Sequence, residues 1–115
     1  MSQTNMLMQA PPFAVEQALA QLGERLRTAR IRRGITMQQA AARIGAGVRS
    51  VRDAERGKAS TAAAVYLALL WSYGLLEQMQ DLGDPLKDIE GLRLIALKEP
   101  KRARAAGFKE LDNDF

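Results

Sequence analysis

Hydrophobic and polar positions between residues 34 and 58 follow the period of two short helices. The first helix is predicted by apolar residues at helical spacing: Met37, Ala40, Ala41 and Ile44. Gly45 and Gly47 then interrupt the pattern, because glycine adopts turn conformations at low cost. A second amphipathic run covers 48–56 and stops at Gly57, a typical helix C-cap. The pattern therefore predicts two helices joined by a tight turn.

The two faces of the second predicted helix differ sharply in chemistry. Val51 and Ala54 share the inward side, and the outward side carries Arg49, Arg52, Asp53 and Arg56. Thr36 is placed to cap the first helix, because its hydroxyl accepts from an unpaired backbone N–H at a helix start. Ala41 and Gly45 are small residues, and we expect the two helices to cross closely at these positions. This spacing is that of a helix-turn-helix, whose second helix enters the DNA major groove.

Several motifs carry a resemblance to one family: Gly34-Ile35-Thr36, Ala40-Ala41, Gly45-Ala46-Gly47, Val51 and Glu55-Arg56-Gly57-Lys58. Together they resemble the Cro/phage-repressor (XRE-type) helix-turn-helix family over roughly residues 22–82. The resemblance implies an all-α, five-helix lambda-repressor-like DNA-binding domain with an N-terminal helical extension and a short C-terminal extension. Two positions depart from the family pattern. Met37 stands where a phosphate-binding glutamine is usual, and Gly47 where a Ser/Thr cap is usual.

The flanking regions also read as helical. Residues 13–33 predict one long helix, or two divided near Gly23, and 13–22 supplies either extra core or a dimer contact. Ser60 or Thr61 is expected to cap a helix over 62–73, which is apolar nearly all round and so predicts a buried central helix. A fifth helix is expected over 75–82.

Beyond residue 83 the pattern weakens. Asp84 and Pro85 predict the start of a further element, and 91–98 fits either a helix or a short strand. The tail is charged and is expected to be disordered alone, with Phe108, Leu111 and Phe115 as spaced apolar anchors. The expected divisions are a flexible arm at 1–12, the DNA-binding domain at 13–83, and a C-terminal extension and tail at 84–115.

Charge is distributed unevenly along the chain. The net charge is +4, but residues 22–58 hold ten Lys/Arg against three acids, a net of +7. Residues 59–100 hold three Lys/Arg against six acids, a net of −3. A basic segment that coincides with the helix-turn-helix pattern favours a polyanion partner over a merely solvated surface.

Composition narrows the function classes further. The chain has 115 residues, 47% of them hydrophobic and 5% aromatic, which suits one small helical domain. It lacks cysteine and histidine, so we expect no disulfide, no usual zinc site, no cofactor and no histidine-based catalysis. We also expect no enzyme activity. No signal-peptide pattern or run of about 18 apolar residues is present, so a cytoplasmic protein without a membrane partner is expected.

The resemblance and the charge pattern together assign DNA contacts. Base contacts are expected from the start and outer face of the second helix, at Val48, Arg49, Ser50, Arg52 and Asp53. Asp53 is expected mainly to orient a neighbouring arginine, and Glu55 to pair with an arginine across the fold. Phosphate contacts are expected at flanking positions, namely Gln38, Arg43, Arg56, Lys58, Ser60 and Thr61.

Partners follow from the small size of the domain. One such module buries little DNA surface, so we expect a homodimer on an inverted repeat in double-stranded DNA. Its interface is expected at Trp71, Leu75, Leu76 and Met79, with core packing as the simpler interpretation. The layout also resembles the antitoxin partner of HipA-type kinase toxins, which implies autoregulation of a toxin–antitoxin operon. The alternatives are a stand-alone XRE-type repressor, or a protein-interaction module that does not bind DNA.

Overall fold

In a computed structural model, the described residues 2–98 are helical or in turns and contain no strand, which confirms the predicted all-α class. The chain divides into two compact units, Met1–Glu77 and Gln78–Phe115. Among the described residues, no helix is both long and apolar enough to cross a membrane. The predicted anchors Phe108, Leu111 and Phe115 lie outside the described residues, and the predicted limits at residues 12 and 83 remain predictions.

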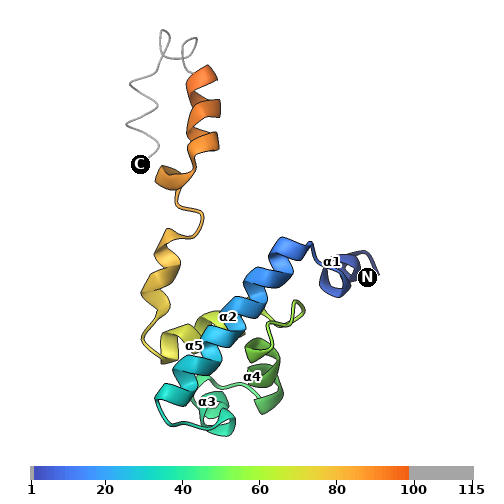
Figure 1. Ribbon diagram of the computed structural model, residues 1–115, viewed down its shortest axis with the longest axis vertical. Coiled ribbons are helices and arrows are strands. Elements are labelled where there is room, and N and C mark those ends of the chain that lie inside the picture. The colour runs from blue at the N-terminus through green and yellow to red at the C-terminus, as the bar shows by residue number, and fades with distance from the viewer. Residues whose placement is uncertain (1, 99–115) are drawn as a thin grey trace. The chain divides into compact units, whose positions relative to one another are not determined.

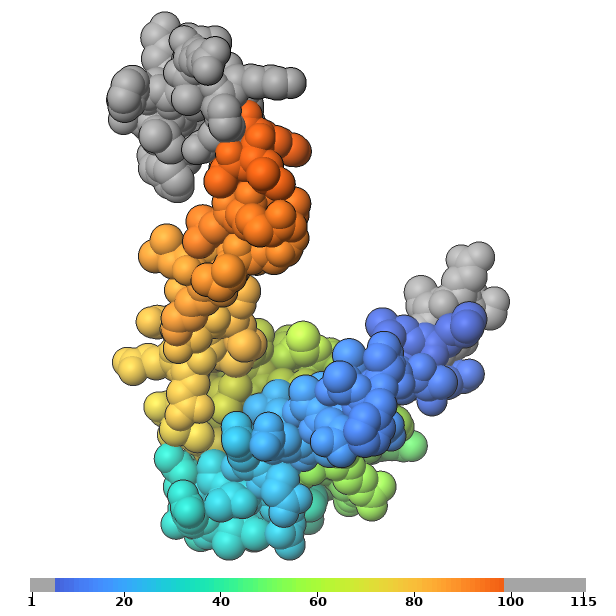
Figure 2. Space-filling view, turned by 45° about the horizontal axis from the view of Figure 1, so that its top comes forward, coloured from blue at the N-terminus to red at the C-terminus, as the bar shows by residue number. Residues whose placement is uncertain are grey.

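The first unit begins with two helices, α1 (Ser2–Gln9) and α2 (Phe13–Arg32). Helix α1 lies within the stretch that the sequence assigned to an arm. Helix α2 is one continuous element, so the alternative of a break near Gly23 was wrong. Gly23 is buried, and a Cβ there would lie 2.6 Å from the carbonyl oxygens of Ala54 and Glu55. Glycine at position 23 therefore allows α2 to pack closely on α4. Figure 2 shows the first half of α2, in blue, on the surface of this unit.

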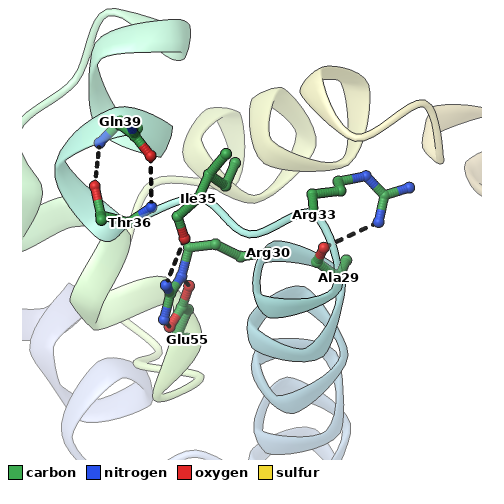
Figure 3. Close-up of polar contacts among 7 residues, drawn as sticks. All are labelled: Ala29, Arg30, Arg33, Ile35, Thr36, Gln39 and Glu55. Carbon is green, nitrogen blue, oxygen red and sulfur yellow. Dashed lines mark hydrogen bonds and ion pairs between the residues drawn. The ribbon is translucent and has the colours of Figure 1, made fainter.

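Helices α3 (Met37–Ile44) and α4 (Val48–Glu55) are the two predicted helices of the helix-turn-helix. Thr36 caps α3 as predicted. Its hydroxyl accepts from the Gln39 N–H at 3.0 Å, and the Gln39 side chain accepts from the Thr36 N–H at 2.9 Å (Figure 3). Gly47 precedes α4 with an extended backbone and makes no side-chain cap.

The expectation that Gly45 allows two helices to cross closely was wrong. Gly45 is exposed, and nothing lies within 4 Å of the position where its Cβ would stand. Its φ of 73° gives the reason for glycine, since it ends α3 in the left-handed conformation. Ala41 is buried, as expected of a small residue at the helix contact.

Helix α5 (Ala63–Ser72) completes the core of this unit, where α2, α3, α4 and α5 pack together (Figure 1). The core is small and rich in alanine and leucine, with Leu26, Ala29, Ala40, Ala41, Val51, Ala54, Tyr66, Leu69, Leu70 and Tyr73 buried. The expected caps Ser60 and Thr61 were wrong, because the N-cap is Ala62 and lacks a side-chain bond. Burial on all sides was also wrong. Trp71 is 63% exposed because the small core covers only part of α5.

The predicted fifth helix over 75–82 is instead a 3₁₀ helix, η1 (Leu76–Asp81). A second 3₁₀ turn, η2 (Pro85–Lys87), begins as predicted, with the Asp84 carboxylate accepting from the Leu86 N–H at 2.9 Å. Residues 89–98 then form an α-helix, so the strand alternative was wrong. Asp88 caps this helix by accepting from the Gly91 N–H at 2.9 Å.

Candidate nucleic-acid interface

Helix α4 places cations on one face and packs the other against the core. Val51 and Ala54 are 0% exposed, as their inward prediction required. Arg49, Arg52 and Arg56 are exposed. An eight-residue helix is too short to be stable alone, so packing of its apolar face is what holds the outward arginines in a defined arrangement.

A buried ion pair fixes the C-terminal end of α4. Arg30 donates from Nε to Glu55 Oε2 at 2.6 Å and from Nη2 to Oε1 at 3.1 Å, and its Nη1 donates to the Ile35 carbonyl at 3.0 Å (Figure 3). This two-point contact confirms that Glu55 pairs with an arginine across the fold. Hydrogen bonding to Glu55 raises the pKa of Arg30 above its ordinary value, against the opposing effect of burial. The pair joins α4 to the end of α2.

The partner of Asp53 is not an arginine. Its carboxylate Oδ2 lies 3.7 Å from Lys58 Nζ, and the Lys58 N–H donates to the Asp53 carbonyl at 3.0 Å. The expectation that Asp53 orients an arginine was therefore wrong in this structure. The Tyr66 hydroxyl donates to the Lys58 carbonyl at 2.8 Å. The Lys58 backbone is thus held on both sides, by its N–H to α4 and by its carbonyl to α5, which positions the Lys58 ammonium beside α4.

The other predicted phosphate contacts come before α4 (Gln38 and Arg43) and after it (Ser60 and Thr61) in the sequence. Gln38, Arg43 and Ser60 are exposed, whereas the Thr61 hydroxyl is buried and has no hydrogen-bond partner. Met37 is half-buried, and the Gln39 side chain is occupied by the cap of α3. Gln38 and Gln39 are both exposed, and Gln38 is the one whose side chain the cap of α3 does not use.

At the start of α4 the side chains are more enclosed. Val48 and Ser50 are half-buried and Arg49 between them is exposed. The turn that presents them is closed by the Ala46 N–H, which donates to the Ala41 carbonyl at 2.9 Å. The structure therefore gathers Arg49, Arg52, Arg56 and Lys58 along one helix and its following loop.

Arg30 and Arg33 have structural roles that the sequence pattern did not assign to them. Arg30 is 9% exposed, and Arg33 donates from Nη2 to the Tyr73 carbonyl at 2.9 Å. The Arg33 guanidinium also lies 5.4 Å from the centre of the Tyr73 ring. Arg30 follows Leu26 by one helical turn, and Arg33 follows Ala29 by one turn, so this spacing marks both as candidates for the buried face without choosing between them.

The four residues predicted for a dimer interface differ in exposure. Trp71 is 63% and Leu76 38% exposed, while Leu75 and Met79 are half-buried. Core packing does not account for Trp71, because most of its ring surface is in contact with solvent. A large exposed aromatic side chain is typical of a contact with another molecule.

Comparison with protein families supplies one independent finding. A family model described as a helix-turn-helix domain matches residues 21–82, which is more than half of the chain. The match includes both helices of the predicted motif and the packing residues of α2 and α5. Comparisons with curated proteins and with solved structures gave no match.

Proposed function

This chain belongs to the helix-turn-helix domain family, and on that premise we propose that it is a sequence-specific repressor that binds double-stranded DNA. The observation that carries the proposal is the division of α4. Val51 and Ala54 are fully buried while Arg49, Arg52 and Arg56 are exposed. A helix anchored in this way can enter the major groove with its charged face forward.

Base reading is assigned to the first two turns of α4. Arg49 and Arg52 each suit a bidentate bond to guanine O6 and N7, worth about 1–3 kcal/mol of discrimination. Val48 suits contact with a thymine methyl, and Ser50 suits either donor or acceptor edges. Asp53 is assigned a supporting role, since its carboxylate lies beside Lys58.

Phosphate binding is assigned to the exposed polar groups around α4. These are Gln38, Arg43, Arg56, Lys58 and Ser60. Their contribution is electrostatic and independent of sequence, and each neutralised phosphate makes affinity more sensitive to salt. Thr61 is left out because its hydroxyl is buried.

The repressor is proposed to act as a homodimer on an inverted repeat. Two half-sites about 34 Å apart on one face of DNA would give the contact area that a single module lacks. The exposure of Trp71 and Leu76, next to the half-buried Leu75, supports a contact between copies.

A narrower proposal is that the chain is the antitoxin of a toxin–antitoxin operon. One support is the resemblance to the antitoxin partner of HipA-type kinase toxins. The other is the exposure of apolar residues that follow α5, with Leu82 at 67% and Leu86 at 79%. Purification of the chain from its own cells tests it. A kinase-like protein retained in stoichiometric amount is the expected result, and purification of the chain alone would count against it.

DNA binding is tested by fluorescence anisotropy, using an operator isolated by selection from random duplexes. The double variant Arg49→Ala with Arg52→Ala is expected to lose about 100-fold or more in affinity for that operator. The matched control is Arg25→Ala with Arg27→Ala, which removes the same charge from exposed positions of α2. Equal losses of affinity in both double variants would mean that DNA binding depends only on overall charge, and would reject Arg49 and Arg52 as base-contacting residues.

A further inference from the structure

The helix over residues 89–98 exposes an unusual amount of apolar surface for its length. Its described part covers residues 89–98, and Ile89, Leu92, Leu94, Ile95 and Leu97 are between 47% and 72% exposed. Among the described residues, none after Tyr73 is buried. Because most helical stability in proteins comes from packing of an apolar face, this helix calls for a surface that covers it.

One face of this helix is purely apolar. With about 100° between successive residues, Ile89, Leu92, Ile95 and Ala96 share an arc of roughly 120°. The other side carries the ion pair between Glu90 and Arg93, with Arg93 Nη2 lying 2.6 Å from Glu90 Oε2. Leu94 and Leu97 lie on this charged side, which leaves the first arc as the surface to be covered.

Charge along the axis indicates what covers it. At the N-terminal end, three acidic residues (Asp84, Asp88 and Glu90) outnumber one basic residue, Lys87; Arg93 lies near the middle and Lys98 at the C-terminal end of the described part. An antiparallel copy of the same helix would bring unlike ends together and oppose the two helix dipoles, while a parallel copy would bring like charges together. The apolar strip from Ile89 to Ala96 is about 10 Å long, and a second copy of the same helix offers a strip of equal length.

We infer that helix 89–98 pairs antiparallel with the same helix of a second copy of this chain, through Ile89, Leu92, Ile95 and Ala96. The centre of the contact lies between residues 92 and 93. Ile89 then faces Ala96 of the second copy, and the two copies of Leu92 lie side by side. The pairing adds a second contact between copies to the one proposed at Trp71 and Leu76. Its role in repression rests on the proposed function, although the contact forms without DNA.

Because the chain has no cysteine, single cysteines report this contact cleanly. Leu92→Cys in the full chain, oxidised with diamide at low micromolar concentration without DNA, is expected to give a disulfide-linked dimer. The matched control is Leu94→Cys, since Leu94 is 48% exposed against 47% for Leu92 but points about 160° away. We expect at least tenfold less dimer from the control.

Orientation is tested with residues at the two ends of the apolar strip. An equimolar mixture of Ile89→Cys and Ala96→Cys chains is expected to link, while each variant alone does not. Linking by Ile89→Cys alone would mean parallel pairing and overturn the assignment. Equal linking by Leu92→Cys and Leu94→Cys, or none by either, would overturn the contact itself.

Two further measurements distinguish pairing between copies from packing within one chain and from DNA binding. If helix 89–98 packs against its own chain, Leu92→Cys will react slowly with a thiol reagent yet form no dimer, which contradicts the inference. DNA binding is measured separately by anisotropy on the unmodified chain. Its absence would reject the repressor, whereas the cross-link pattern would still decide the contact between copies.

Discussion

Helix α4 and the helix described over residues 89–98 are both amphipathic but have opposite surroundings. Helix α4 buries Val51, Ala54 and Glu55 within its own unit. The later helix buries none of its residues and exposes an apolar arc. Amphipathic patterning therefore states only that a face will be covered. Whether the cover comes from the same unit or from another molecule is decided by the surfaces available around the helix.

The largest effect on stability is expected when the buried ion pair between Arg30 and Glu55 is removed. Glu55→Ala leaves the Arg30 guanidinium buried without its carboxylate, which typically costs about 3–5 kcal/mol. The free energy of unfolding, measured by urea denaturation, should fall by that amount. The control is Glu90→Ala, which breaks the exposed pair with Arg93 and should leave the free energy of unfolding nearly unchanged, because solvent screens that pair. Similar losses of stability in the two variants would contradict the conclusion that the Arg30–Glu55 pair fixes α4 in the fold.

Replacing glycine by alanine should have opposite effects at Gly23, where α2 packs on α4, and at Gly91 in the helix over residues 89–98. Gly23→Ala forces a Cβ to within 2.6 Å of backbone oxygens of α4 and should cost about 1–3 kcal/mol of stability. At Gly91 the atoms in the way belong to the Asp88 side chain, which can move. Gly91→Ala should therefore increase helix content by circular dichroism, because alanine favours a helix by roughly 1 kcal/mol over glycine. A loss of helix content there would show that the new methyl group displaces the Asp88 cap of this helix.

The smallest effects compare one apolar truncation in each helix. Val51→Ala removes two fully buried methyl groups and should cost about 1.6 kcal/mol in thermal or urea unfolding. Leu92→Ala, at a concentration where the chain is monomeric, should change stability by less than about 0.5 kcal/mol. At high concentration the Leu92 variant should instead weaken self-association. A large loss in the dilute Leu92 variant would mean that its own chain covers it.

Much of the helix-turn-helix could be predicted because its signals are local. The Thr36 cap depends on residues three apart, and the inward positions of Val51 and Ala54 depend on helical period alone. The pairing of Glu55 with an arginine was also predicted, although not which arginine. Sequence could not identify Arg30, because five nearby arginines share the same charge and only the packing of α2 on α4 buries one of them.

Other features depended on contacts that no local pattern records. Asp53 lies beside Lys58 because the loop after α4 folds back, and that return is held by Tyr66 from α5. Trp71 was grouped with an enclosed helix, yet the small core leaves it exposed. The DNA contacts, the dimer interface and the toxin partner remain predictions, which anisotropy, cross-linking and purification from the native cells address in turn.

By itself the sequence determined the helical class, the cap and turn between α3 and α4, and the two faces of α4, since each depends on residues within about a turn of one another. Only the tertiary structure decided which arginine is buried, why Gly23 is required and which apolar faces stay uncovered. Those outcomes depend on how closely separate helices approach, and burial is a property of the assembled surfaces rather than of any one segment.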